Sequence, residues 1–251
     1  MAFKIALTAG HYKGTPGKRC MKKLDKKQIR EWWLNDRIAD KIEKKLKNYT
    51  GYQLIRTDDT TGKKDISLQA RTNAANNFKA DFYLSIHHNA GIKGGKGGGI
   101  MAIVYNKTTK SESIAWQKEL YNALIQATGL KGNRATPLAK QNLHEVRETK
   151  MPAVLLELGF MDSATDVPII LSEKYADQCA DAIVKVIVKR AGLKKKVVEQ
   201  PKIAETVKVY YRVQVGIYEN PDHAKTMKEK LEKAGFPCVV KQEVHEENQN
   251  E

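Results

Sequence analysis

The chain has 251 residues, which is enough for one large domain of about 150 to 200 residues and a smaller one. Lysine and arginine number 44 against 29 acidic residues, giving a net charge of +15, so we expect attraction to a polyanion: nucleic acid, anionic membrane or anionic cell-wall polymer. The three cysteines, Cys20, Cys179 and Cys238, are widely separated and odd in number, which argues against a disulfide framework and against a cysteine-based zinc site.

The positive charge is concentrated in the first part of the chain. From Leu193 onward there are 11 basic and 10 acidic residues, whereas 33 basic and 19 acidic residues precede it. The N-terminal segment reaches His11 before a hydrophobic region of secretory length can form, and no later apolar run is long enough to span a bilayer. We therefore expect a protein that is made in the cytoplasm without a signal peptide and reaches any other compartment only after release by lysis.

Strands and helices alternate along the first half of the sequence. Apolar runs predict three strands, and apolar residues at helical spacing predict two helices between them. Asp25 and Gln28 form a capping box at the start of the first helix. In chain order the predicted elements are a strand at 3–9, a helix at 25–48, a strand at 52–57, a helix at 67–78 and a strand at 82–86.

The alternation continues to about residue 191. The predicted elements are a strand at 98–105, a helix at 111–128, a loop at 129–150 with a short strand near 143–146, a strand at 153–160, and helices at 162–171 and 175–191. Such alternation predicts an α/β fold with a twisted, mainly parallel sheet flanked by helices.

The composition changes after Gly192. We assign residues 1–192 to the first domain, 193–206 to a linker, and 207–251 to a small C-terminal module. Within the module, a strand at 207–217, a helix at 220–234 and a strand at 237–242 predict a βαβ unit, and the acidic tail beyond it is expected to be disordered.

Four residues are candidates for metal binding or catalysis. His11 and His87 follow the ends of two predicted strands, and Glu157 interrupts a nearly apolar one. Glu31 lies on the same helix stripe as Leu34 and is about six residues inside the predicted helix. A carboxylate on a buried stripe or in a buried strand is costly unless it is paired or bound to metal. Two simpler interpretations remain: Glu31 as a first-turn acid favoured by the helix dipole, and Glu157 as a strand-end side chain in solvent.

The topology brings these residues together, because the carboxyl ends of parallel strands meet at one edge of a sheet. Two histidines and a carboxylate with one open position are typical of a catalytic zinc site. A further glutamate then remains to transfer a proton, which zinc-assisted hydrolysis of an amide requires.

Four blocks of this sequence resemble the motifs of the zinc-dependent N-acetylmuramoyl-L-alanine amidases of the Amidase_3 type. The blocks are Thr8–His11, Glu31 with Asn35, Ser85–Ala90 and Pro152–Phe160. The resemblance covers residues from about Lys4 to Ala191 and implies that His11, Glu31 and His87 ligate one Zn²⁺, while Glu157 is the catalytic carboxylate. It also favours His87 over His88 as the ligand, since adjacent strand side chains point to opposite faces.

The C-terminal segment from Tyr211 to Phe236 is similar to the first half of a sporulation-related repeat (SPOR) domain. The resemblance implies binding to glycan strands stripped of their peptides. Either a second copy of the chain supplies the other half in a dimer, or the module is a degenerate fragment, and the sequence leaves both open.

These observations predict a lytic enzyme of bacterial peptidoglycan that cuts the amide between N-acetylmuramic acid and L-alanine, as a phage endolysin or a mother-cell autolysin. One alternative within the same class is a zinc peptidase that cuts the stem peptide. Another, from a different class, is a basic binding protein without enzymatic activity, for which Glu31 and Glu157 would have no purpose. We expect no nucleic-acid partner.

Overall fold

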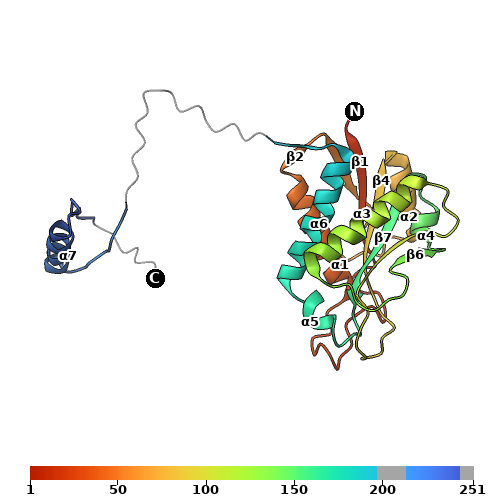
Figure 1. The fold of residues 1–251 in the computed structure, drawn as a ribbon, viewed down its shortest axis with the longest axis horizontal. Coiled ribbons are helices and arrows are strands. Elements are labelled where there is room, and N and C mark those ends of the chain that lie inside the picture. Colours follow the sequence, from red (N-terminus) through yellow and green to blue (C-terminus); the bar gives the residue numbers. More distant parts are fainter. Residues whose placement is uncertain (197–212, 244–251) are drawn as a thin grey trace. The chain divides into compact units, whose positions relative to one another are not determined.

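The computed structural model describes residues 1–196 and 213–243. The chain divides into two units, Met1–Val197 and Val198–Glu251. The division falls within the predicted linker at 193–206, most of which lies outside the described residues. Figure 1 shows the elements of both units.

The first unit is built on a sheet of six strands in the order β3-β1-β4-β7-β5-β6. The four strands β3, β1, β4 and β7 are parallel, whereas β5 is antiparallel to β7 and β6 follows the direction of β5. This mainly parallel sheet confirms the predicted fold class. The strands are β1 (Phe3–Ala9), β3 (Tyr52–Arg56), β4 (Phe82–Asn89), β5 (Ile100–Tyr105), β6 (Leu138–Gln141) and β7 (Ala153–Phe160).

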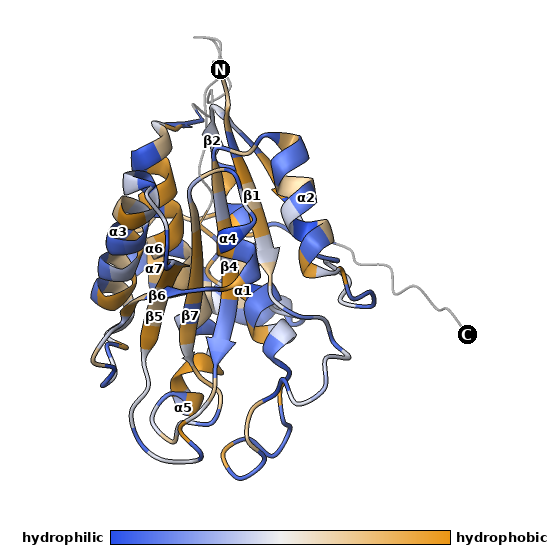
Figure 2. Ribbon diagram, turned by 90° about the vertical axis from the view of Figure 1, so that its right-hand side faces the viewer, coloured by the Kyte–Doolittle hydropathy of each residue, from blue (hydrophilic) through white to orange (hydrophobic). Residues whose placement is uncertain are grey.

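Helices cover both faces of this sheet, and apolar strand residues fill the space beneath them (Figure 2). On one face lie α1 (Glu31–Leu46), α3 (Ser111–Thr128) and α6 (Glu173–Ala191). On the other face lie α2 (Leu68–Phe78) and the one-turn helix α4 (His144–Arg147). The remaining elements of this unit are the short helix α5 (Val167–Ile170) and a separate two-stranded ribbon of β2 (Tyr49–Thr50) and β8 (Lys194–Lys195).

The alternation of side chains along β4 decides which layer each of its residues meets. Phe82, Leu84 and Ile86 are fully buried against the α1 layer, whereas Tyr83 is fully buried on the α2 and α4 side. The same alternation places His87 on the side of Tyr83. Sequence periodicity therefore determines which side of the sheet each part of the site occupies.

Helix α1 begins later than predicted, because Asp25 is used in a turn and does not cap the helix. The Asp25 carboxylate accepts hydrogen bonds from the backbone N–H groups of Lys27 and Ile29, at 3.0 and 2.7 Å. Gln28 has a left-handed φ of 50°, which a helix does not allow. The helix starts at Glu31, so this residue is a first-turn acid as well as a buried one.

The segment 129–150 also differs from its prediction. The strand in it is β6 at Leu138–Gln141, which pairs with β5, whereas the residues near 143–146 form α4. The Gln117 side chain stabilises β6 beside β5, because its amide donates hydrogen bonds to the carbonyl oxygens of Ala102 on β5 and Ala139 on β6, both at 2.8 Å. The predicted helix at 162–171 shortens to α5, because Asp162 accepts three backbone N–H groups of the loop after β4.

The second unit contains the helix α7 (Pro221–Lys233), which confirms the predicted helix at 220–234, and the Asn220 side chain caps it. No strand is assigned among its described residues, 213–243, so the predicted strand at 237–242 is wrong. Of the predicted strand at 207–217, residues 207–212 lie outside the described part and the rest is not a strand. The apolar residues concerned, such as Val213 and Val239, are more than 80% exposed, and an isolated strand pair without a covering surface is not stable.

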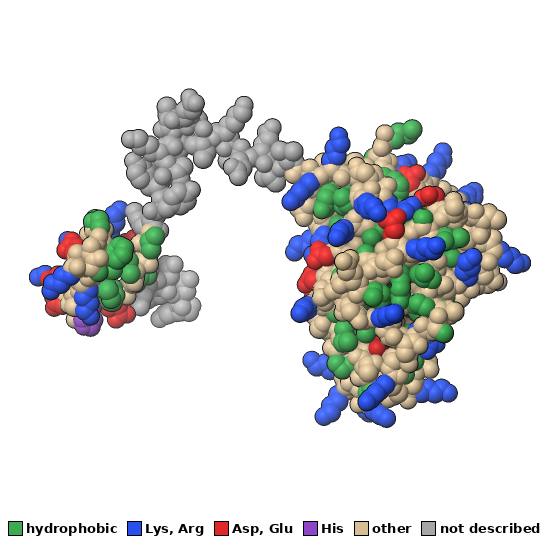
Figure 3. All heavy atoms as spheres, in the orientation of Figure 1, with side chains coloured by type: hydrophobic (Ala, Val, Ile, Leu, Met, Phe, Trp, Pro, Cys, Tyr) green, Lys and Arg blue, Asp and Glu red, His purple; other side chains and the backbone are tan. Residues whose placement is uncertain are grey.

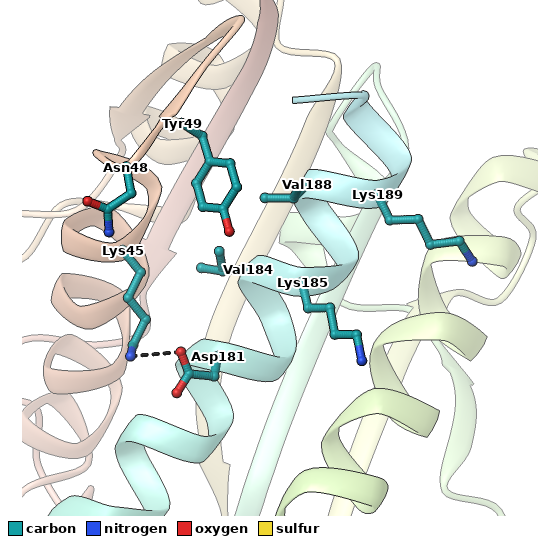
Figure 4. A pocket seen from close by; sticks show the side chains of 8 residues that line it. All are labelled: Lys45, Asn48, Tyr49, Asp181, Val184, Lys185, Val188 and Lys189. Atoms are coloured by element: carbon teal, nitrogen blue, oxygen red, sulfur yellow. Dashed lines mark ion pairs between the residues drawn. The ribbon is translucent and has the colours of Figure 1, made fainter. Parts of the chain in front are cut away.

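Two surface features complete the first unit. Figure 3 shows that Lys and Arg side chains are spread over its visible face and do not gather in one patch. A groove of about 480 Å³ lies between the C-terminal parts of α1 and α6 (Figure 4). Lys45, which lines it, is 14 residues beyond Glu31 on α1, or about 21 Å along the helix axis.

None of the helices in 1–196 or 213–243 has the length and apolar character needed to cross a membrane.

Candidate metal and catalytic site

Three side chains from separate elements converge where β1 and β4 end and α1 begins. His11, Glu31 and His87 each present one nitrogen or oxygen atom, and these atoms all lie within 4.8 Å of one another. We call this group the His-Glu-His cluster. The structure thus brings together the three residues that the sequence predicted as metal ligands.

His11 is positioned through its backbone. It follows β1 with a left-handed φ of 67°, a conformation that is uncommon for a residue other than glycine. The buried Arg71 holds this turn, because its guanidinium donates to the carbonyl oxygens of His11 and Ala9 at 2.9 and 2.7 Å and to Thr8 Oγ1 at 2.9 Å. The imidazole is thereby directed to Glu31, with 3.3 Å between His11 Nε2 and Glu31 Oε1.

Glu31 is completely buried, and its two oxygens have different environments. Oε1 lies 3.1 Å from His87 Nδ1 and accepts the backbone N–H of His88 at 3.2 Å, whereas Oε2 has no hydrogen-bond partner. Burial alone would raise the pKa of Glu31, but hydrogen bonds from His11 and His87 outweigh it and hold the pKa well below its ordinary value. Glu31 is therefore an ionised, buried carboxylate whose Oε2 accepts no hydrogen bond and lies 3.7 Å from Lys18 Nζ.

His87 lies between two carboxylates. Its Nδ1 faces Glu31, and its Nε2 is 3.4 Å from Oε2 of Glu145. Burial would lower the pKa of His87, but hydrogen bonds and charges from Glu145 and Glu31 raise it to about 10. The ring also packs directly over Gly10, where a Cβ would overlap it, so glycine is required at this position. The site favours positive charge at this point.

The adjacent His88 lies outside the cluster. Its side chain is 2% exposed and faces α1, where its Nδ1 is 2.8 Å from Oδ1 of Asn35. Burial lowers the pKa of His88 to about 3, so this imidazole is neutral. Its geometry separates it from His87, as strand alternation predicted.

Glu157 is on β7, directly opposite His87 in the strand register. Its Oε2 is buried and has no hydrogen-bond partner, which argues against the interpretation of a strand-end side chain in solvent. Burial raises the pKa of Glu157 to about 7, with Glu31 and Glu145 adding to the effect and His87 and Lys18 opposing it. A carboxyl group with this pKa can both accept and release a proton near neutral pH.

Glu145 was missed by the sequence analysis. It belongs to α4, is 4% exposed, and accepts a hydrogen bond from Tyr83 Oη at 2.6 Å. Burial would raise the pKa of Glu145, but contacts with His87 and Tyr83 lower it to about 2. The segment around it is basic and has no periodicity, so the only available signal was an acid between the apolar Leu143 and Val146.

The donor set fits a divalent metal. Two imidazoles and one carboxylate match the N and O ligands that catalytic zinc sites use, and such sites keep one position open for water or substrate. Oε2 of Glu31 and Oε2 of Glu157 support this interpretation, since buried polar atoms normally have hydrogen-bond partners and these two have none, although Lys18 Nζ lies 3.7 Å from the Glu31 oxygen. A cluster of this kind beside a carboxyl with a raised pKa is typical of a metal-dependent hydrolase.

Comparison with known families identifies the hydrolase class. The N-acetylmuramoyl-L-alanine amidase family matches residues 5–189, and the chain therefore belongs to this family of enzymes that act on peptidoglycan. The SPOR domain family matches residues 180–242. Both predicted resemblances are confirmed, although the SPOR match begins within α6, whose Ile183 and Ile187 are buried in the core of the first unit.

Individual relatives agree with this assignment. The chain is 30% identical over 240 residues to the sporulation-specific N-acetylmuramoyl-L-alanine amidase of Bacillus subtilis, covering 94% of this chain and 84% of the relative. Its fold is similar to the N-acetylmuramoyl-L-alanine amidase from Clostridium difficile, with a TM-score of 0.68 and 28% identity over 76% of this chain and 97% of that one. The catalytic domain of CwlV from Paenibacillus polymyxa gives a TM-score of 0.66 and 26% identity, covering 76% and 99% of the two chains.

Proposed function

We propose that this chain is a zinc-dependent amidase that cuts peptidoglycan between N-acetylmuramic acid and L-alanine. In this proposal His11, Glu31 and His87 hold one Zn²⁺ and Glu157 carries the catalytic proton. The observation that supports it best is the pair of buried oxygens on Glu31 and Glu157 that accept no hydrogen bond, at the edge where the two histidines meet. The Glu31 oxygen suits a bound metal, and the Glu157 oxygen suits a hydrogen bond with a water molecule.

A bound Zn²⁺ would supply a Lewis acid and lower the pKa of water towards about 7. Glu157 takes a proton from the attacking water, whose oxygen adds to the lactyl carbonyl carbon. The same carboxyl then gives the proton to the amide nitrogen as the C–N bond breaks. The products are the lactyl carboxylate and a stem peptide with a free L-alanine amino group.

Family membership favours this reaction over both alternatives. A peptidase that cuts within the stem peptide would need the same metal chemistry, so the site alone does not separate the two. A binding protein without activity would gain nothing from the buried carboxylates Glu31 and Glu157, which cost free energy unless they are paired or bound to metal.

The second unit supports a further part of the proposal. Through its SPOR match, we propose that it binds glycan strands of the same peptidoglycan and so keeps the enzyme on its substrate. The proposal also includes synthesis in the cytoplasm, action on the wall after lysis, and an endolysin or autolysin role. A dimer that completes the C-terminal module is a separate proposal, tested by the mass of the protein in solution.

The direct test is clearing of a suspension of purified peptidoglycan. We expect the wild type to clear it, and we expect a chelator to stop clearing and Zn²⁺ to restore it. Glu157→Gln keeps the shape of the side chain but removes the proton carrier, so the rate of clearing should fall by about 10²- to 10⁴-fold. Glu148→Gln, the same exchange at an exposed residue that pairs with Arg147, is the control. Full clearing by Glu157→Gln would contradict the mechanism.

Metal content separates the two adjacent histidines. Glu31→Ala should lower the zinc stoichiometry, because it removes a proposed ligand. His88→Ala should keep it, because His88 faces Asn35 instead of the cluster. Loss of zinc in His88→Ala alone would mean that the ligand assignment is wrong.

A further inference from the structure

A buried carboxylate lies behind the His-Glu-His cluster and belongs neither to it nor to the proton transfer. Glu145 is 4% exposed on the one-turn helix α4, which packs on the same face of the sheet as Tyr83. It is separated from His87 by 58 residues in sequence, and no strand pairing holds the two together. A buried ionised carboxylate costs free energy unless its oxygens are well partnered, so its partners indicate its purpose.

The partners of Glu145 are three successive side chains on one face of β4. Residues 83, 85 and 87 share this face, because side chains alternate along a strand. Tyr83 Oη donates to Oε1 at 2.6 Å, and Ser85 Oγ lies 3.3 Å from both oxygens. With Oε1 fixed by Tyr83, Oε2 is directed to His87 Nε2 at 3.4 Å.

The two nitrogens of His87 therefore have different tasks. Nδ1 lies 3.1 Å from Glu31 and faces the cluster, whereas Nε2 faces Glu145. A ligating imidazole must leave its lone pair on the nitrogen that meets the metal, and a carboxylate on the opposite nitrogen fixes the proton there. The same contact holds the plane of the ring and makes its Nδ1 atom a stronger ligand for the metal.

We propose that Glu145 is a positioning residue that orients His87 for metal binding through its Nδ1 atom. Tyr83 and Ser85 hold the carboxylate, and the carboxylate holds the ring. This inference rests on the proposed metal site. Glu145 does not replace Glu157, because the Glu145 oxygens are already engaged by β4 side chains whereas Glu157 keeps a buried free oxygen.

A purely structural role would have different consequences. The buried Arg71 is a positive charge that also lowers the pKa of Glu145, so the carboxylate could serve only to balance this charge. Replacement of Glu145 would then lower the stability of the metal-free protein and leave its affinity for zinc unchanged. A positioning role predicts a change in metal affinity and in the geometry of the bound metal.

The test compares full-length wild type with Glu145→Gln, Tyr83→Phe and Glu148→Gln. The dissociation constant for Zn²⁺ is measured by competition with a chromophoric chelator, and the absorption spectrum is recorded after loading with Co²⁺. We expect Glu145→Gln to raise the dissociation constant about 10- to 100-fold and to shift the Co²⁺ bands. Tyr83→Phe should raise it by a smaller factor, and Glu148→Gln should leave both readouts unchanged.

The outcomes separate the two levels of the proposal. If the wild type does not bind zinc, the proposed metal site is wrong. If the wild type binds zinc and folded Glu145→Gln binds it equally well with an unchanged Co²⁺ spectrum, only the positioning role is overturned. If Glu145→Gln does not fold, Tyr83→Phe decides: a raised dissociation constant supports the role, and an unchanged one overturns it.

Discussion

Replacement of Arg71 should disturb both the stability of the first unit and its metal site. The guanidinium is 2% exposed and donates to four acceptors: the carbonyl oxygens of Ile66, Ala9 and His11, and Thr8 Oγ1. Methionine has a similar length but donates nothing. Arg71→Met therefore leaves these acceptors without donors, and it removes one of the two positive charges beside the Glu145 carboxylate, the other being His87.

The size of the effect follows from these contacts. Each buried acceptor left without a partner costs about 1–3 kcal/mol, but the four share one side chain and relax together, so the separate costs do not add. Removal of one member of a buried charged network costs about 3–5 kcal/mol, and we expect Arg71→Met to lower the free energy of unfolding by this amount. Arg71→Lys keeps the charge, but its single nitrogen cannot reach all four acceptors, so its effect should be intermediate.

Tryptophan fluorescence during urea unfolding is a suitable assay. The three tryptophans of the chain, Trp32, Trp33 and Trp116, all lie in the first unit, so the signal does not report the second. Arg147→Met, at a partly exposed arginine that pairs with Glu148, is the matched control and should change stability by less than about 0.5 kcal/mol.

The same variant tests the positioning of His11. Without the clamp on its carbonyl, the left-handed turn at His11 is less well held, so the dissociation constant for zinc should rise in Arg71→Met. A stability loss below about 1 kcal/mol together with wild-type zinc affinity would refute the reasoning.

Three further predictions concern separate parts of the molecule. Gly10→Ala places a Cβ on the His87 ring and should weaken zinc binding at least about tenfold in the chelator assay, or about 1.4 kcal/mol; unchanged binding would show that the ring can move freely. Buried neutral His88 has a pKa of about 3, against an ordinary value of 6.5, so the unfolded chain binds a proton there first as the pH falls. Between about pH 6.5 and 4.5, the free energy of unfolding of the metal-free wild type should therefore fall by about 2–3 kcal/mol more than that of metal-free His88→Gln. Equal decreases in the two proteins would contradict this prediction. A chain truncated after Val197 should keep the stability of the first unit but bind stripped glycan strands more weakly in a pull-down; equal binding would mean that the second unit does not contribute.

The strands were predictable because their signals are local. Phe3–Ala9 and Ala153–Phe160 are apolar runs whose bounds in the structure equal the predicted ones. The rule that parallel strands share an edge was then sufficient to bring His11 and His87 together. The burial of Glu31 was predicted correctly, but the start of its helix was not. Asp25 resembles a helix cap in the sequence but closes a turn in the structure.

The residues behind the site were not predictable by the same means. Arg71 and Glu145 look like ordinary surface charges in a sequence with 29% charged residues. Their burial depends on partners about 60 positions away, which no local pattern reports. The predicted strand at 237–242 and residues 213–217 of the other predicted strand are not strands for a related reason, because alternation predicts a strand only where another surface covers its apolar face.

We propose that this chain hydrolyses the bond between N-acetylmuramic acid and L-alanine with Glu157 as proton carrier. The most direct measurement is the product chemistry of digested peptidoglycan, with free amino groups labelled and identified and with reducing sugar ends counted in the same samples. We predict that wild type releases L-alanine amino groups without new reducing ends, and that Glu157→Gln releases neither. New amino groups on any other residue of the stem peptide, or release of L-alanine amino groups by Glu157→Gln at the wild-type rate, would contradict the claim.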